Sequence, residues 1–111
     1  MEKSLSQSFI TEMRRGNLTL LVLASLYQPH YGYELLEILQ DVGVAIEANT
    51  LYPLLRRLEK QELLSSTWDT TESRPRKYYQ ISSLGEEIFR ELLVESKKMS
   101  VSLQRIQGED E

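Results

Sequence analysis

Hydrophobic residues recur at helical spacing in four stretches before residue 60. These positions are Leu5, Phe9, Ile10 and Met13, then Leu18, Leu21, Val22 and Leu26, then Leu35, Ile38, Leu39 and Val42, and finally Leu51, Leu54, Leu55 and Leu58. The first two stretches form either one long helix or two helices separated near Gly16. Pro29 stops the second stretch, because proline disfavours the helical conformation of the preceding residue. We expect Gly43 to cap the end of the third helix, and Asn49 or Thr50 to cap the start of the fourth.

An alternating pattern follows and predicts two strands, near residues 63–68 and 76–81, joined by a polar turn. One face of the first strand would carry Leu64, Ser66 and Trp68, and one face of the second Tyr79 and Ile81. We expect Tyr79 to lie in the core, because most tyrosines in such patterns pack through their rings. Trp68 would pack the sheet against the next helix or, as the alternative, line a pocket at the centre of a dimer.

The rest of the chain predicts one long helix from Ser83 to about Gln107, in which Ser83 and Glu86 fit a capping box. Its hydrophobic positions repeat about every 3.5 residues. A helix of about 24 residues is about 36 Å long, so one small domain does not bury its far end. A second copy of the chain is the simplest source of the missing contacts. The expected dimerisation residues are Leu5, Phe9, Ile10, Ile88, Leu92, Met99, Leu103 and Ile106.

The helix near residues 48–60 has a basic face that points away from its leucine stripe, and a basic hairpin follows it. A helix that can enter a groove, followed by a basic hairpin, is the arrangement of a winged helix-turn-helix. The predicted fold is therefore mainly α with a small β-hairpin (α+β), with an N-terminal and a long C-terminal helix for dimerisation. Its candidate DNA contacts are Tyr33, Asn49, Thr50, Tyr52, Arg56, Lys60, Arg74, Arg76 and Lys77. The alternative is an amphipathic surface helix with a solvated basic face, next to a hairpin whose charges protect its edge.

The charge of the chain bears on both alternatives. The formal net charge of −4 by itself argues against nucleic acid. Residues 48–80 nevertheless hold six Lys and Arg against four Asp and Glu. Because salt screens charges over about 8 Å, DNA would respond to this local excess. The net negative charge supports a second function class, a winged-helix adaptor that contacts proteins and does not bind DNA.

Enzyme and metal chemistry find no motif in this sequence. The chain has one histidine, His30, and no cysteine, so thiolate ligands and a cysteine nucleophile are excluded. HExxH, GxSxG and glycine-rich phosphate loops are missing as well. We therefore expect no catalytic residue, no metal site and no cofactor. The lack of cysteines, of a signal peptide and of an apolar run near about 20 residues predicts a cytoplasmic protein without a membrane partner.

Three segments together resemble the PadR family of bacterial transcriptional regulators. They are Tyr31-Gly32-Tyr33, TLYPLLRRLEKQELL at residues 50–64 and RPRKYYQISSLGEE at residues 74–87. Arg15-Gly16 also matches the start of the family pattern, so the resemblance covers about residues 10–107. It implies a winged-helix dimer, usually a repressor, that is joined through its N-terminal and C-terminal helices. It also adds Pro53 to the candidate DNA contacts of the recognition helix.

Some members of that family respond to phenolic acids and others to planar drugs bound at the dimer interface. The resemblance therefore makes a small aromatic effector a candidate partner. Two positions depart from the family pattern. Glu62 stands where glycine commonly follows the recognition helix, and Ser96 stands where the drug-binding branch has a tryptophan on its C-terminal helix. A pocket of stacked tryptophans is for this reason not carried over to this chain.

The sequence predicts a winged helix-turn-helix domain with its N-terminal helix at residues 1–82, a dimerisation helix at 83–107 and an acidic tail at 108–111. The function we expect is that of a DNA-binding transcriptional regulator. It would bind a palindromic operator as a homodimer, act as a repressor, and leave the operator when a small aromatic ligand binds.

Overall fold

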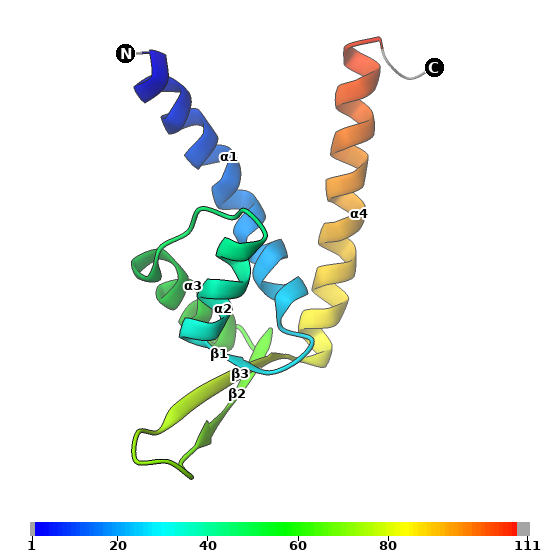
Figure 1. Cartoon of the computed structure of the whole chain (residues 1–111). Coiled ribbons are helices and arrows are strands. Elements are labelled where there is room, and N and C mark those ends of the chain that lie inside the picture. The colour runs from blue at the N-terminus through cyan, green and yellow to red at the C-terminus, as the bar shows by residue number, and fades with distance from the viewer. Residues whose placement is uncertain (1, 109–111) are drawn as a thin grey trace.

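The computed structural model describes residues 2–108, and this part of the chain contains four helices and three strands. In chain order they are α1 (Glu2–Ser25), β1 (His30–Tyr31), α2 (Gly32–Asp41), α3 (Ala48–Lys60), β2 (Leu64–Asp69), β3 (Arg76–Ile81) and α4 (Ser83–Ile106). The strands form one antiparallel sheet in the order β1-β3-β2 (Figure 1). The predicted α+β class with a winged helix-turn-helix is confirmed. Apart from Gly108, the predicted acidic tail lies outside the described residues.

The core lies where the C-terminal half of α1 meets α2, α3 and the sheet. The most deeply buried side chains are Val22, Leu23, Leu26, Leu35, Leu39, Leu51, Leu55 and Leu58. Ile46, Leu64, Tyr79 and Ile81 complete this cluster, so the predicted burial of Tyr79 is confirmed. Each fully buried leucine contributes about 1.5–3 kcal/mol of hydrophobic stabilisation. The leucine stripes of α2 and α3 therefore hold the two helices of the helix-turn-helix together.

Helix α1 runs without a break through Gly16, so the N-terminal stripes belong to one helix and not two. A Cβ built on Gly16 would meet nothing within 4 Å. No other element therefore lies close to this glycine, and the helix continues through it. It ends at Ser25, shortly before Pro29, as the proline predicts.

Strand β1 is a feature that the sequence analysis missed. His30 pairs with Tyr79 and Tyr31 pairs with Tyr78, so that the segment after Pro29 adds a third strand to the sheet. Two residues are too few to produce an alternating pattern. Only the pairing with β3, about 48 residues further along the chain, makes them a strand.

The expected cap at the start of α3 is wrong. The helix begins at Ala48, and the residue before it, Glu47, makes no side-chain capping bond. Asn49 and Thr50 lie inside the first helical turn. Both are exposed, so their side chains face outward from the recognition helix instead of closing its end.

Helices α2 and α3 end in the same way, in a Schellman motif. After α2, the N–H of Gly43 donates to Gln40 O, and Gly43 takes a φ of 91° as expected for a capping glycine. After α3, the N–H of Glu62 donates to Glu59 O at 2.9 Å, and the next N–H donates to Leu58 O at 2.9 Å. Glu62 therefore occupies a left-handed position, with a φ of 67°, that normally favours glycine.

The start of α4 is built one residue earlier than the predicted capping box. Ser82, not Ser83, caps the helix, and its Oγ accepts the N–H of Gly85 at 3.0 Å. The same hydroxyl donates to Glu62 O at 2.7 Å. A Cβ on Gly85 would lie 2.2 Å from Leu63 O, so only glycine lets α4 approach the turn after α3 this closely. The first turn of α4 is thus attached directly to the end of the recognition helix.

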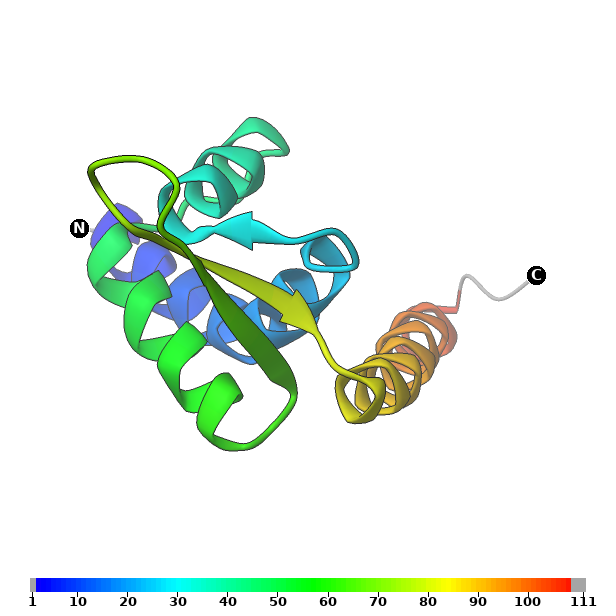
Figure 2. The same cartoon turned by 90° about the horizontal axis from the view of Figure 1, so that it is seen from below.

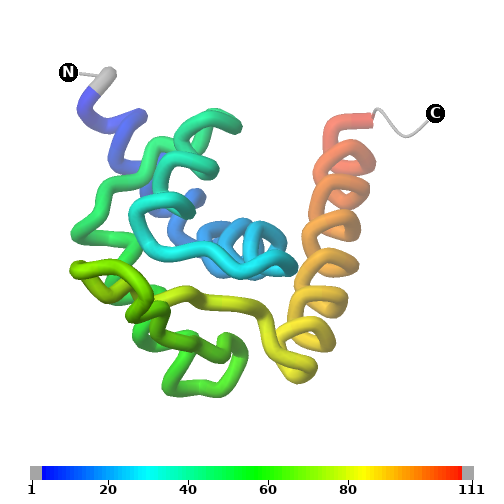
Figure 3. Tube along the Cα trace, turned by 60° about the horizontal axis from the view of Figure 1, so that its bottom comes forward, coloured from blue at the N-terminus to red at the C-terminus, as the bar shows by residue number. Residues whose placement is uncertain are grey.

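Beyond the core, α1 and α4 diverge and project away from the sheet (Figures 1 and 3). Both free ends carry exposed apolar side chains: Leu5, Phe9 and Met13 on α1, and Met99, Leu103 and Ile106 on α4. Three further residues expected at a dimer interface, Ile10, Ile88 and Leu92, are half-buried. Ile88 and Leu92 pack against the core of their own chain. The exposed members of the predicted dimerisation set therefore lie toward the far ends of the two helices.

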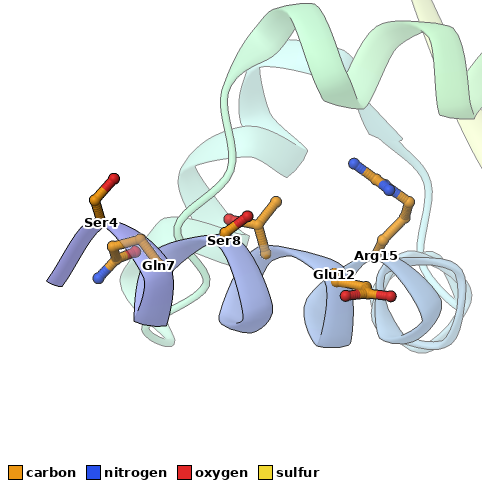
Figure 4. Close-up of a pocket in the computed structure, with 6 residues that line it drawn as sticks. Ser4, Gln7, Ser8, Glu12 and Arg15 are labelled. Atoms are coloured by element: carbon orange, nitrogen blue, oxygen red, sulfur yellow. The ribbon is translucent and has the colours of Figure 1, made fainter. Parts of the chain in front are cut away.

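The opposite side of α1 is polar. Figure 4 shows Ser4, Gln7, Ser8, Glu12 and Arg15 projecting from this helix. All of these side chains are exposed. Together with Thr11 these side chains line a shallow hollow along α1. Among the described residues, no other element forms a second wall of this hollow. Helix α1 is thus amphipathic even where it leaves the core, with one apolar and one solvated face.

Candidate nucleic-acid interface

Helix α3 turns its leucines inward and its basic residues outward. Leu51, Leu55 and Leu58 are buried, whereas Arg56 and Lys60 are exposed. The predicted DNA contacts that this helix exposes are Asn49, Thr50, Pro53, Arg56 and Lys60. The neighbouring Arg57 is exposed as well. One side of α3 therefore presents cations and hydrogen-bonding groups while the other side anchors the helix.

Tyr52 packs against the first turn of α2. A Cβ on Gly32 would lie 2.1 Å from Cε1 of Tyr52, so the glycine makes room for this ring. The Tyr52 side chain is half-buried as a result. Tyr33, by contrast, is 58% exposed. Of the two tyrosines expected to bond phosphates, Tyr33 is thus the more available.

The β2–β3 hairpin forms the wing, which extends past the helices at the end of the molecule opposite the free ends of α1 and α4 (Figure 1). The Arg76 guanidinium lies 4.5 Å from the centroid of the Tyr31 ring, a cation–π contact. Tyr31 in turn meets Tyr78 edge to face, with ring centroids 5.5 Å apart. Strand β1 therefore orients a wing arginine. Arg74, in the turn before β3, is exposed.

Lys77 forms an ion pair that connects the wing to the recognition helix. Its Nζ donates to Glu59 Oε1 at 2.9 Å, and the other carboxylate oxygen of Glu59 accepts a short hydrogen bond from Ser66. Glu59 lies on α3, Ser66 on β2 and Lys77 on β3, so one carboxylate ties the recognition helix to both wing strands. The hydrogen bonds from Ser66 and Lys77 lower the pKa of Glu59, and the bond to Glu59 raises the pKa of Lys77.

Trp68 does not pack in the interior, and the prediction that it does is wrong. Its side chain is 62% exposed on β2. Leu64 at the base of this strand is buried, but the strand continues past the edge of the core, where residues 67–69 are all exposed. Alternation predicts which residues share a face. It does not reveal whether anything lies against that face.

Arg56, Lys60, Arg74 and Arg76 are exposed cations of this surface. Within the described residues, none of them has a carboxylate partner within 4.0 Å. Two nearby carboxylates are held by other groups, Glu59 by Lys77 and Asp69 by Thr71. The backbone N–H and the hydroxyl of Thr71 lower the pKa of Asp69. This face is therefore locally basic although the whole chain is acidic.

Other kinds of site find no support in residues 2–108. No cluster of three His, Asp or Glu suited to a metal occurs there, and none of the helices in this range is long and apolar enough to cross a membrane. His30 faces Glu34, with Nδ1 and Oε1 3.0 Å apart, on the outside of α2. The arrangement as a whole, two helices anchored by leucines with a basic helix face and a basic wing, defines a winged helix-turn-helix protein.

Comparison with known proteins agrees with this class. The model of the transcriptional regulator PadR-like family matches residues 20–91. The solved structure of a PadR family transcriptional regulator from Eggerthella lenta is similar, with a TM-score of 0.90 and 43% identity over 96% of this chain and 95% of that one. A PadR-like transcription factor from Bacteroides fragilis has a TM-score of 0.74 and 32% identity, over 89% and 98% of the two chains. An uncharacterised protein of Lysinibacillus sphaericus is 32% identical over 90 residues, 77% of this chain and 83% of that protein.

The chain belongs to the PadR-like family of transcriptional regulators. The family that its motifs indicate is thereby confirmed, and so is the expectation that the protein is a regulator and not an enzyme. The matched segment runs from α1 into α4 and contains the whole helix-turn-helix and wing. The sequence analysis missed three residues of this surface, Tyr31, Glu59 and Trp68. Tyr31 and Glu59 act through tertiary contacts, which leave no periodic signal in the sequence.

Proposed function

We propose that this regulator is a homodimeric repressor that binds a palindromic DNA operator through α3 and the wing. The observation that carries the proposal is the set of four accessible cations, Arg56, Lys60, Arg74 and Arg76, on two adjoining elements. Each lacks a carboxylate partner in the part of the chain that the structure describes. A row of such cations is suited to phosphates, because each contact releases counterions from the DNA.

In this mode of binding the two elements have different tasks. Helix α3 would enter the major groove, where Arg56 and Lys60 reach base edges or phosphates and the exposed Asn49 and Thr50 donate near its start. The wing would contact the backbone through Arg74 and Arg76. Lys77 adds positive charge near the turn of the wing, opposite Trp68, while it holds Glu59.

The far ends of α1 and α4 support the dimer. Met99, Leu103 and Ile106 are 70%, 54% and 83% exposed, and an apolar row of this kind is stable when a second copy covers it. A two-fold dimer would place two recognition helices in successive major grooves about 34–36 Å apart. The homodimer therefore accounts for a palindromic operator.

A groove between α1 and α4 is where we propose a small aromatic effector would bind. Its apolar lining includes Met13, Leu20, Leu92 and Met99, and Ser96 lies in the same groove. It adjoins the surface that we assign to the dimer. An effector bound here would alter the angle between the two copies and so the distance between their recognition helices.

The test of DNA binding is a matched pair of quadruple alanine variants. One variant replaces Arg56, Lys60, Arg74 and Arg76, and the control replaces the exposed Arg14, Arg15, Arg90 and Lys97 elsewhere on the molecule. Both lose four positive charges. Binding to a labelled random duplex should weaken by about 100-fold or more in the first variant only, and its salt slope should flatten by about one unit per lost phosphate contact. Equal affinity of both variants would contradict the proposal.

Selection of bound genomic fragments tests the operator. We expect an inverted repeat whose half-site centres lie about 10–10.5 base pairs apart, and lower transcription from a promoter that carries it when the protein is present. A direct repeat or a single half-site would contradict the two-fold arrangement, and increased transcription would contradict repression. If the protein shows no salt-dependent retention on heparin or random duplex DNA, the protein-binding adaptor is the better assignment.

A further inference from the structure

An open cleft of about 490 Å³ lies between the wing and the helix-turn-helix. The wing lines it with Trp68, Arg74 and Arg76, and the other side is formed by Tyr31, Tyr33 and Tyr52. Since Tyr33 belongs to α2 and Tyr52 to α3, the cleft opens beside the start of both helices of the helix-turn-helix. It combines aromatic rings with guanidinium groups in one concave surface.

Two of the rings in this cleft are accessible to a partner. Trp68 is 62% exposed and Tyr33 is 58% exposed, although both are large and mostly apolar. A tryptophan side chain can bury up to about 250 Å² of its own surface, so leaving it in water forgoes considerable hydrophobic stabilisation. In contrast to the apolar rows of α1 and α4, this aromatic surface has cations beside it.

The charges of the cleft select an anionic occupant. Arg74 and Arg76 lack carboxylate partners within 4.0 Å among the described residues. The Asp69 carboxylate, across the hairpin from Arg76, accepts hydrogen bonds from Thr71 at 2.7 and 3.0 Å, and the charge of Arg76 is a smaller influence on its pKa. The ligand should therefore alternate negative groups with apolar ones. A sugar–phosphate backbone does so, since each deoxyribose lies between two phosphates.

We propose that the cleft receives the backbone of one strand of duplex DNA, with Trp68 packed against a deoxyribose and Arg74 and Arg76 on the flanking phosphates. This inference rests on the proposed DNA binding and adds to it a contact that carries no charge. Duplex DNA fits better than an acidic peptide because Tyr52 of α3 forms part of the wall. A strand that leaves the recognition helix would therefore run directly into the cleft. Trp68 would fix the wing on the backbone at any sequence.

The chain itself provides the probe, because Trp68 is its only tryptophan. In the full-length protein, intrinsic fluorescence should change as duplex DNA is added and should saturate at the same concentration as the anisotropy of a labelled duplex. Inorganic phosphate and poly-glutamate serve as comparison anions. If anisotropy saturates while the emission of Trp68 stays constant, the cleft is empty in the complex and the inference is wrong, although DNA binding stands. If neither signal changes, the proposed function itself fails. A response to poly-glutamate alone would instead indicate an acidic protein partner.

Variants separate packing from charge. Trp68→Ala should weaken binding of the labelled duplex about tenfold, as for other aromatic contacts to nucleic acid, and should leave the salt slope unchanged. Trp68→Phe keeps an aromatic ring, so its affinity for the duplex should fall much less than that of Trp68→Ala. Arg74→Ala should instead flatten the salt slope by about one unit. Because Trp68 is exposed, circular dichroism should show both tryptophan variants folded. Equal affinity of Trp68→Ala and the unaltered protein would overturn the inference.

Discussion

Glu62 takes a backbone conformation that its side chain disfavours. A left-handed φ costs a non-glycine residue about 1–2 kcal/mol, yet Glu62 has a φ of 67°. The Schellman bonds at the end of α3 and the bond from Ser82 Oγ to Glu62 O require this geometry. Glu62 therefore replaces the glycine that is common in the family at this position, and the Schellman cap of α3 is kept. The glutamate makes the cap less stable than glycine would.

Replacing Glu62 with glycine should raise the free energy of unfolding by about 0.5–1 kcal/mol. The strain that is relieved exceeds the extra entropy that glycine brings to the unfolded chain. Urea denaturation followed by circular dichroism measures the difference. Glu62→Ala is the control: it removes the same carboxylate and keeps the strain, so its stability should stay close to that of the original protein. A glycine variant less stable than the alanine variant would show that the cap is not strained.

At the scale of elements, the wing and the recognition helix are held as one unit by a single carboxylate. Glu59 accepts hydrogen bonds from Ser66 of β2 and Lys77 of β3. The side chains of Glu59 and Lys77 are only 31% and 28% exposed, which limits screening by water. This attachment fixes the angle between the two elements that we propose to contact DNA. Because Lys77 is paired with Glu59, part of its positive charge is neutralised within the protein.

Glu59→Gln should lower the free energy of unfolding at pH 7 by about 1 kcal/mol, because it removes a partly screened charged hydrogen bond. The folded pKa of Glu59 lies below the ordinary value of 4.5, so its stabilising effect is present above that value. The effect is lost as the pH falls through the folded pKa. Denaturation curves of both proteins should therefore converge in acid. A difference that is the same at pH 7 and in acid would show that the carboxylate charge is not responsible.

At the scale of the whole molecule, the two ends have different surfaces. The wing lies at one end and the free ends of α1 and α4 at the other (Figure 1), and the view from below has α3 and the wing toward the viewer (Figure 2). The first end carries the exposed cations of α3 and the wing, and the second carries exposed apolar side chains. Helix α4 connects them, because its first turn is fixed to the end of α3 through Ser82 and Gly85. A displacement of α4 would therefore also displace the end of the recognition helix α3.

Replacing Leu103 and Ile106 with glutamate should convert the proposed dimer into a monomer, as sedimentation would show. The control replaces Val94 and Val101, which are 51% and 50% exposed on the opposite side of α4, and should leave the mass unchanged. Affinity for a full operator should fall toward the affinity for one half-site, because linked sites lose their effective concentration. Affinity for a single half-site should persist. A monomer with full operator affinity would contradict the two-fold assembly.

Much of this molecule follows from local patterns. The leucine stripes predicted the core helices, alternation predicted β3 at residues 76–81, and Gly43 predicted the end of α2. These features depend on periodicity and on single-residue backbone preferences, which act over a few positions. The basic face of α3 followed from the same stripe, since residues opposite buried leucines must face outward.

Tertiary structure alone decided the remaining features. Strand β1 exists only because β3 pairs with it, and Trp68 is exposed because β2 extends beyond the core. The Glu59–Lys77 pair joins residues 18 positions apart, and Tyr52 takes its place because Gly32 leaves room for it. Each depends on how far elements extend and where they meet, and such distances have no period in a sequence. The sequence by itself thus determined the helices, the hairpin, the family and the basic charge of α3 and the wing, and the packing added β1 and decided how these elements form a cleft.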